Sequence, residues 1–363
     1  ALYRGARILI LDEPTAVLTP QESEALFATL GQMVAEGLSI IFISHKLGEV
    51  LRVSHRVAVL RGGRLVAESA AAGTTEAQLA EWMVGHVVAT RTRQPAQAVG
   101  EVVCALHDVH TAGSTRERLR GVWLELRAGE VVAVAGVSGN GQVALAELLS
   151  GLRVPSHGEA LVFGEPVRDS AAGLAWRGVA RIPEDRAGVG VVGDLPLWEN
   201  AVAERIGSRW FSNAFGWVRR GAARAHAARV VQRFDVRGGG LDAPARALSG
   251  GNMQKLILGR ALTPLEAHEA EVPKLVVAHQ PTWGLDIGAV DFVQQQLIAA
   301  RDAGAAVLLI SDDLDEVLGM GDRIAVMHAG QLTPAEPPER WTRASIGMAM
   351  AGAVEAAPAE AAA

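Results

Sequence analysis

The stretch VVAVAGVSGNGQV, residues 131–143, passes from a short apolar run into a glycine-rich loop. The run VVAVA has the length and composition of a buried parallel strand. Gly136, Gly139 and Gly141 would then let the backbone curl so that several N–H groups face one anion. A helix is predicted to begin near Gln142, and its positive end would favour the same anion. This order predicts a phosphate-binding loop, although a tight strand-to-helix turn would use the same glycines.

The loop lacks the two side chains with which a hydrolytic phosphate loop ends. A Lys would contact the β- and γ-phosphates there, and the next residue, Ser or Thr, would bind Mg²⁺. This chain has Gln142 and Val143 at those positions. Gln donates a hydrogen bond without charge, and Val cannot coordinate a metal. We therefore expect this loop to bind nucleotide weakly at best and to support no turnover.

A second feature is a repeat at a constant offset. The segment ILILDEPTAVL (8–18) returns as LVVAHQPTWGL (275–285), 267 residues later. The same offset joins LGEVLRVSHRVAVLRGGRLV to LDEVLGMGDRIAVMHAGQLT without a gap. Such a match predicts a duplicated domain, and chance similarity is a poor alternative. The counterpart of the glycine loop would precede residue 1, so we expect a fragment of a longer two-domain protein; a natural short form is the alternative.

Composition narrows the class of protein. The 363 residues are 49% hydrophobic and 20% charged, which is typical of a globular chain with one large or two medium domains. No apolar run approaches the ~18 residues that a membrane span needs. A net charge of −6 argues against nucleic acid as the main ligand. The single cysteine, Cys104, fits a reducing compartment.

The order of predicted elements indicates an α/β protein. Strands are expected over 6–12, 38–43, 56–60 and 64–67, and helices over 21–36 and 46–52. Residues 210–240 are rich in Arg and Ala with helical spacing. Strands that alternate with helices predict a sheet covered by helices.

Two further motifs follow the glycine loop. In LSGGNMQK (248–255), Ser249 can cap a helix, while Gly250 and Gly251 expose backbone N–H groups beside its positive end. About thirty residues later comes AHQPTWGLD (278–286). An ordinary helix cap would explain the first motif alone, but the order of all three is specific.

This ordered set resembles the ATP-binding cassette ATPases over nearly the whole chain. Four segments are similar in sequence to the double-cassette ATPases of bacterial sugar and nucleoside importers: LYRGARILILDEPTAVLTPQE, FISHKL, RIPEDR and LSGGNMQKLILGRAL. GNGQ and AHQPTWGLD favour the nucleoside or purine branch over the ribose and galactose branch. The resemblance implies an α/β fold, a P-loop NTPase cassette with a mixed, largely parallel sheet and a helical subdomain, duplicated with an incomplete first copy. The implied segments are 1–85, the C-terminal part of the first cassette; 86–100, a linker; 101–349, a complete but degenerate second cassette; and 350–363, a disordered tail.

The resemblance also implies roles for single residues. Asp12 would hold Mg²⁺, Glu13 would polarise the attacking water and His45 would contact the γ-phosphate. A solvated strand end is the alternative for the two acids. The second copy has His279, Gln280 and Asp312 in these places, so one site is expected to be competent and the other degenerate. The implied nucleotide-binding residues are Gly136, Ser138, Gly139, Asn140, Gly141, Gln142, Val143, Glu184, Ser249, Gly250, Gly251, Gln254 and Asp286.

The implied function is that of an energy-coupling subunit of an importer for a nucleoside or simple sugar, with ATP and Mg²⁺ as cofactors. The full-length parent would hydrolyse ATP at the cytoplasmic face of the bacterial plasma membrane, whereas this chain alone would show little or no turnover. Its partners would be integral membrane permease subunits, a substrate-binding protein and a facing cassette within or between chains, and no nucleic acid. VVGDLPLWENAV (191–202) is a candidate permease contact, with ordinary internal packing as the alternative. A cassette ATPase acting on ribosomes or DNA, and a non-hydrolysing pseudo-cassette, are the competing classes.

Overall fold

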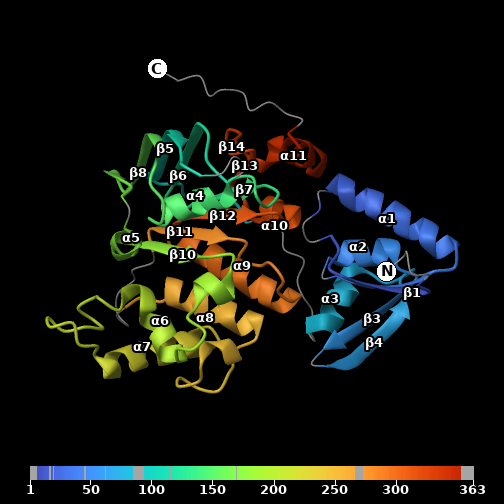
Figure 1. The fold of residues 1–363 in the computed structure, drawn as a ribbon, viewed down its shortest axis with the longest axis horizontal. Helices are drawn as coiled ribbons and strands as arrows, with labels where there is room; N and C mark the ends of the chain where they lie inside the picture. Colours follow the sequence, from blue (N-terminus) through green and yellow to red (C-terminus); the bar gives the residue numbers. More distant parts are fainter. Residues whose placement is uncertain are drawn as a thin grey trace. The chain divides into compact units, whose positions relative to one another are not determined.

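The computed structural model describes residues 6–15, 18, 20–44, 46–61, 63–84, 94–113, 117–168, 170–265 and 273–352. They form two compact units, coloured along the chain in Figure 1. The first unit comprises the chain up to Thr92 together with Gly284–Asp291, and the second comprises the rest. Within these ranges, no helix has the length and apolarity needed to cross a membrane.

The second unit is built on a six-stranded sheet. Its order is β10 (Val179–Ile182), β11 (Leu275–His279), β12 (Ala306–Ser311), β7 (Val131–Ala135), β13 (Arg323–His328) and β14 (Gln331–Leu332). The first five strands are parallel, and β14 pairs antiparallel at the edge. Every residue of β7, β11 and β12 is buried, as expected for a parallel sheet covered on both faces. Their carboxyl ends meet at one edge, which is where the predicted site residues follow.

An antiparallel sheet and a helix cover one face of this sheet. The antiparallel strands are, in order, β6 (Val122–Arg127), β5 (Val102–His110), β8 (His157–Val162) and β9 (Glu165–Pro166). Their apolar side chains share one core with α4 (Gln142–Leu149) and with the buried face of β11 and β12. This core fixes the start of α4, and therefore the glycine loop, against the sheet.

The remaining helices include a group set beside the sheet. α6 (Leu197–Val202), α7 (Arg220–Arg233) and α8 (Gly250–Leu262) contact one another and form the predicted helical part of the cassette, on one side of the sheet in Figure 1. The other helices are α5 (Ala171–Arg177), α9 (Ile287–Asp302), α10 (Leu314–Met320) and α11 (Arg343–Met350), with short turns of helix at Arg186–Gly190, Ala203–Arg205, Ala245–Ala247 and Pro338–Arg340.

The first unit repeats part of this architecture. Its elements are β1 (Ile8–Asp12), α1 (Pro20–Ala35), β2 (Ser39–Ile43), α2 (Leu47–Val53), β3 (Arg56–Arg61), β4 (Arg64–Ala70) and α3 (Glu76–Val84). Each begins 267 residues before its counterpart among β11, α9, β12, α10, β13, β14 and α11. The strand register is repeated too, since Ile8 pairs with Ser39 and Leu275 pairs with Ala306. The offset found in the sequence is thus also an offset in structure.

The two copies differ in how their strands are covered. β1 and β2 form a sheet of two strands, and Ile10 and Ile41 are 64% and 52% exposed. Their counterparts, Val277 and Leu308, lie in the core of the second unit. In the second unit β11 and β12 have further strands on both sides and α4 on their face, whereas the described part of the first unit has no such neighbours for β1 and β2.

Several expectations need adjustment. The predicted helical region 210–240 contains a helix only from Arg220 to Arg233, because residues 206–219 form a loop in which Ser212 and Val218 pair as an isolated bridge. Within the predicted linker 86–100, residues 94–100 are bonded to the second unit: Ala96 N–H donates to Asp322 Oδ1 at 2.9 Å. Residues 85–93 and the tail from 353 onward lie outside the described ranges.

Candidate nucleotide site

The glycine loop joins the end of β7 to α4, as the sequence predicts. Gly139 and Gly141 have φ of 86° and 114°, a region that residues with a Cβ rarely adopt. Asn140 fastens the loop to the turn between β13 and β14: its carbonyl accepts from Gly330 N–H at 2.8 Å, and its Oδ1 accepts from Ala329 N–H at 2.9 Å. The loop therefore has a fixed conformation.

The Gln142 side chain folds back into this loop. Its Nε2 donates to the Val137 carbonyl at 2.7 Å, and its Oε1 accepts from Asn140 N–H at 2.9 Å. It is only 3% exposed, and a Cβ at Gly136 would lie 2.4 Å from its Nε2. The amide thus occupies the Asn140 N–H, one of the backbone donors of the loop, and an anion could reach this donor only after Gln142 moves. Ser138 is exposed and Val143 half-buried at the ends of the same segment.

Four polar side chains gather where β11 and β12 end. His279 Nε2 lies 3.6 Å from Glu184 Oε2, and burial lowers the pKa of His279 to about 4. The imidazole is therefore neutral at pH 7, and the contact is not a full ion pair. Burial raises the pKa of Glu184, and the negative charges of Asp312 and Asp185 raise it further. The cluster is acidic, which opposes the binding of a polyphosphate.

Gln280 and Asp312 pair with each other in the same cluster. In the orientation of the Gln280 amide that satisfies both groups, its nitrogen donates to Asp312 Oδ1 at 3.0 Å and its oxygen accepts from Asp312 N–H at 3.3 Å. These are the positions at which the resemblance implies a general base and a γ-phosphate-sensing histidine. Here the two side chains are held together by a neutral amide, which cannot take a proton from water.

The first copy has the same backbone at its strand end but carries acids. Glu13 has φ of 45° and its N–H donates to Ile43 O at 2.8 Å; Gln280 has φ of 48° and donates to Ile310 O at 2.8 Å. Asp12 is exposed, at the end of β1. The described residues contain no group of three His, Cys, Asp or Glu side chains placed to share a metal ion. His45 lies outside the described residues.

The signature segment caps and positions α8. Ser249 caps the helix by accepting from Asn252 N–H, and Gly250 and Gly251 form its first turn. Gln254 is fully buried and donates to the Pro281 carbonyl at 2.7 Å, which ties α8 to the loop after β11. Its burial leaves no room for direct contact with a ligand. Asp286 Oδ1 accepts from Ala289 N–H at 3.0 Å at the start of α9.

Arg186 and Glu316 have no role that the sequence predicts. Arg186 donates a hydrogen bond to the Trp283 carbonyl, and its Nη1 is the atom nearest to the position that a side chain at Gly250 would take. Arg186 therefore lies between Trp283 of the PTWGLD segment and Gly250 of the LSGG segment. Glu316 is fully buried beside Thr282, and burial raises its pKa to about 7. Its counterpart Glu49 accepts from Thr15 Oγ1 at 2.6 Å. The repeated Pro-Thr pair could have predicted an acidic partner for each Thr, because a buried Thr hydroxyl needs a hydrogen-bond partner.

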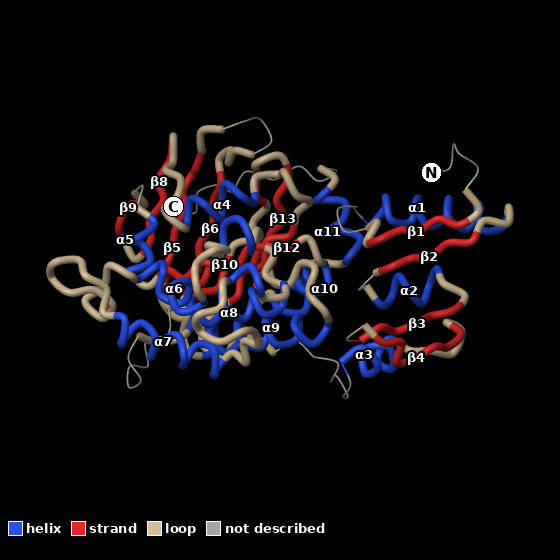
Figure 2. The backbone as a smooth tube through the Cα atoms, turned by 60° about the horizontal axis from the view of Figure 1, so that its bottom comes forward, coloured by secondary structure: helices blue, strands red, loops and turns tan. Residues whose placement is uncertain are grey.

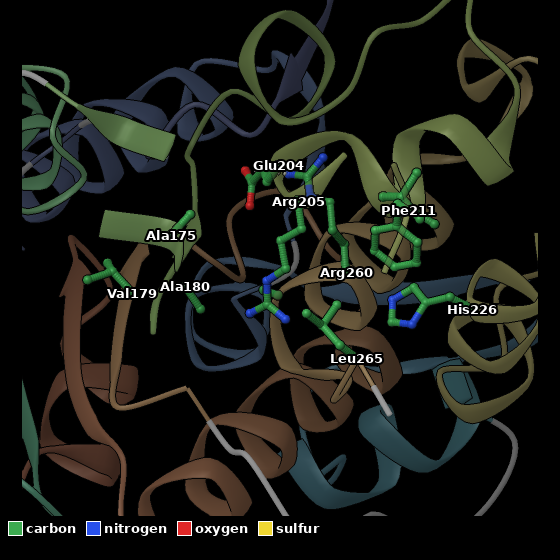
Figure 3. A pocket seen from close by; sticks show the side chains of 12 residues that line it. Ala175, Val179, Ala180, Glu204, Arg205, Phe211, His226, Arg260 and Leu265 are labelled. Atoms are coloured by element: carbon green, nitrogen blue, oxygen red, sulfur yellow. Dashed lines mark ion pairs between the residues drawn. The ribbon is translucent and has the colours of Figure 1, made fainter. Parts of the chain in front are cut away.

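Cavities lie elsewhere in the second unit. One of about 310 Å³ is bounded by α5, residues 189–192 and α8. Glu204 Oε1 lies 2.9 Å from Arg181 Nε and 3.1 Å from Arg260 Nη2 at its wall. Figure 3 shows Glu204 and Arg260 again beside a smaller neighbouring cavity, with His226 and Phe211 opposite. Of the candidate permease contact, Val192 and Leu195 are exposed, but α6 from Leu197 to Val202 is largely buried by packing.

Known proteins are similar to this chain in sequence. Residues 119–265 match the family described as ABC transporter. The chain is 42% identical over 360 residues to the glucose import ATP-binding protein of Haloferax volcanii, which covers 98% of this chain and 64% of that protein. It is 38% identical over 353 residues to the nucleoside import ATP-binding protein of Lactococcus lactis, with 97% and 68% covered.

A solved structure shows the same fold. A nucleotide-free ATP-binding cassette from an ABC transporter aligns with a TM-score of 0.55 at 20% identity, over 72% of this chain and all of that one. The predicted P-loop cassette fold is thereby confirmed. The chain spans about two thirds of the length of the two curated relatives. On this sequence and fold similarity, the chain belongs to the ABC transporter family of ATP-binding proteins.

Proposed function

We propose that this chain is the ATP-binding, energy-coupling part of an importer for a simple sugar or a nucleoside. The similarity to import ATP-binding proteins of both cargo classes supports the importer assignment. The observation that carries the mechanism is the paired strand end: the same backbone presents Asp12 and Glu13 in one copy and His279 and Gln280 in the other. We infer two cassette copies, of which only the first supplies hydrolytic side chains.

At the competent site, the nucleotide would lie between a phosphate loop and the LSGG segment 248–251, within or between chains. Mg²⁺ would neutralise charge on the transferred phosphoryl group, and the exposed carboxylate at the end of β1 fits that ion by its donor chemistry. Asp12 would hold the ion, Glu13 would orient and polarise the attacking water, and His45 would contact the γ-phosphate. Ser249, Gly250 and Gly251 would donate to phosphate oxygens at the start of α8.

The second copy would bind nucleotide without hydrolysing it. Its loop backbone, residues 136–143, would hold the phosphates only after Gln142 leaves the loop. His279 offers a ring nitrogen where Mg²⁺ prefers a carboxylate oxygen, and Gln280 cannot act as base. Glu184 and Asp286 would line this region, and Gln254 would act by positioning the loop after β11 rather than by touching the ligand.

The proposed partners are integral membrane permease subunits at the cytoplasmic face of the membrane, with a substrate-binding protein on the other side. The cavity beside α5, with Val189 and Val192 exposed at 51% and 54%, is the proposed permease contact. A ribosome- or DNA-acting cassette is disfavoured by the net charge of −6.

Reconstituted transport tests this proposal. Proteoliposomes would carry the permease subunits of the import system. Mg-ATP and a form of this protein that also has a phosphate loop for its first copy would lie on the cytoplasmic side, with the substrate-binding protein on the other side. We expect uptake of a labelled sugar or nucleoside that requires both ATP and this chain. A panel of glucose, ribose and guanosine separates the cargo classes. Absence of ATP-dependent uptake across a panel of both classes would contradict the proposal.

A further inference from the structure

A single stretch of the second unit carries an unusual charge. Residues 205–234 contain seven arginines and no Asp or Glu, in a chain whose net charge is −6. The stretch comprises α7 and the loop before it, which Figure 2 shows projecting from the unit between α6 and α7. Residues 209–220 of this loop are called the aromatic–arginine hairpin below. It belongs to neither the glycine loop nor the strand-end cluster.

The tip of the hairpin is an ordered turn. The Asn213 side-chain oxygen accepts from Phe215 N–H at 3.0 Å and from Trp217 N–H at 2.9 Å. Asn213 N–H also donates to the Trp217 carbonyl at 3.0 Å, next to the bridge between Ser212 and Val218. The backbone therefore holds the two aromatic residues in a defined place.

The base of the hairpin is anchored in the helical part. Phe211 is 2% exposed, and its ring lies 5.2 Å from that of His226 on α7; Figure 3 shows the two side chains facing each other. Ser212 Oγ donates to the Ile206 carbonyl at 2.6 Å, and Arg219 N–H donates to the Phe211 carbonyl at 2.7 Å. One aromatic residue thus fixes the hairpin, while those at the tip do not pack inward.

The tip presents its rings to solvent. Phe215 is 88% exposed and Trp217 is 75% exposed, the two highest values for large apolar side chains in the described part of the chain. Burying rings of this size would stabilise the protein, yet the anchored turn holds them in water. Such a device is typical of a binding surface rather than of a solvent-facing loop.

Four of the seven arginines fall into two groups. Farther along α7, Arg224 Nη2 donates to Asp242 Oδ2 at 2.8 Å and Arg229 donates to the Leu265 carbonyl at 2.8 Å. Arg219 and Arg220, beside the tip, are exposed and form no ion pair with any described residue. They also stand at the N-terminus of α7, where the helix dipole disfavours positive charge. Their placement does not serve helix stability, and the charge remains available to a partner.

We propose that the aromatic–arginine hairpin binds the surface of an anionic lipid bilayer. Trp and Phe side chains favour the headgroup level of a membrane, and Arg forms charge-assisted hydrogen bonds with lipid phosphates. The aromatic tip and Arg219–Arg220 supply the two signals that stable attachment of a peripheral protein requires. The net charge of the chain does not separate a bilayer from nucleic acid, because both are polyanions; the exposed rings of Phe215 and Trp217 favour the bilayer, and binding to RNA instead is an outcome of the test. The inference goes beyond the transport proposal and does not depend on it.

Vesicle cosedimentation of the full chain, without nucleotide, tests the proposal. Vesicles of phosphatidylcholine alone are compared with vesicles in which about a third is phosphatidylglycerol, at low and high salt. We expect binding only to the anionic vesicles, weakened by salt. R219Q/R220Q should reduce the partition coefficient roughly 25-fold, about fivefold for each arginine. F215S/W217S should reduce it at least about tenfold.

Matched controls separate this surface from general stickiness. Trp176→Ser changes a ring that is 63% exposed on α5, and Arg340→Gln changes an exposed arginine elsewhere. Both should bind like the wild type, and all variants should keep its melting temperature because the side chains are exposed. No binding of the wild type to anionic vesicles overturns the proposal. So does equal binding by the hairpin variants, or binding to permease or RNA with none to vesicles.

Discussion

Replacing Gln142 by Ala should open the glycine loop of the second copy. The wild-type side chain makes two hydrogen bonds inside the loop, at 2.7 Å to Val137 O and 2.9 Å from Asn140 N–H. Displacing it breaks both, and a neutral hydrogen bond contributes about 1 kcal/mol net, so nucleotide binding has to overcome about 2 kcal/mol. Without this competitor, the Asn140 N–H is free for a phosphate. Q142A should therefore bind ATP roughly 30-fold more tightly.

Titration calorimetry of the full chain with Mg-ATP measures this change. The matched control is Gln142→Glu, which is of similar size, keeps an acceptor for Asn140 N–H and adds a negative charge, so its affinity should fall below that of the wild type. Q142A should also lose about 1–3 kcal/mol of unfolding free energy, which urea denaturation checks. If folded Q142A bound ATP no better than the wild type, the view of Gln142 as an occupant of the phosphate position would be wrong.

Three further outcomes are expected. Gln142→Lys should restore charge to the loop without any ATP hydrolysis, measured as phosphate release, because Gln280 still cannot act as a base. The folded pKa of Glu316 is about 7, above its ordinary 4.5, so its contribution to stability is full below pH 4.5 and is lost as pH rises through 7. The free energy of unfolding of the wild type should therefore fall by about 3 kcal/mol between these two pH values. Glu316→Gln should remove this fall, which urea unfolding of both proteins at each pH measures. Gln254→Ala should cost about 1–3 kcal/mol of unfolding free energy, because the Pro281 carbonyl loses its hydrogen-bond donor. The free energy of ATP binding should change by less than the free energy of unfolding.

The sequence predicts local elements well because their signals are local. The 267-residue offset carries through to element starts and strand register, since apolar pattern and turn glycines act on neighbouring residues. The helix expected over 210–240 begins only at Arg220, because Asn213 organises a turn through its own side chain. A helical spacing of Arg and Ala could not reveal this competition.

The sequence names candidate site residues, but it does not predict their contacts. The replacement of acids at His279 and Gln280 is visible in the sequence alone. The return of Gln142 into the loop is not, because it depends on where the Val137 carbonyl and the Asn140 N–H point after folding. Gln254 was expected to touch nucleotide, yet it is buried against the Pro281 carbonyl, a contact between residues 27 positions apart. Side-chain direction in loops is decided by such non-local contacts.

ATP hydrolysis by paired strand-end variants tests the central claim most directly. A form of the protein that also carries a phosphate loop for the first copy would be assembled with its permease, and phosphate release would be compared for wild type, Glu13→Gln and Gln280→Ala. We predict that E13Q lowers the rate at least about 100-fold, as expected when a positioned base is lost, while Q280A stays within about threefold of wild type. Equal loss in both variants, or turnover that survives E13Q, would contradict the division into one hydrolytic and one non-hydrolytic copy.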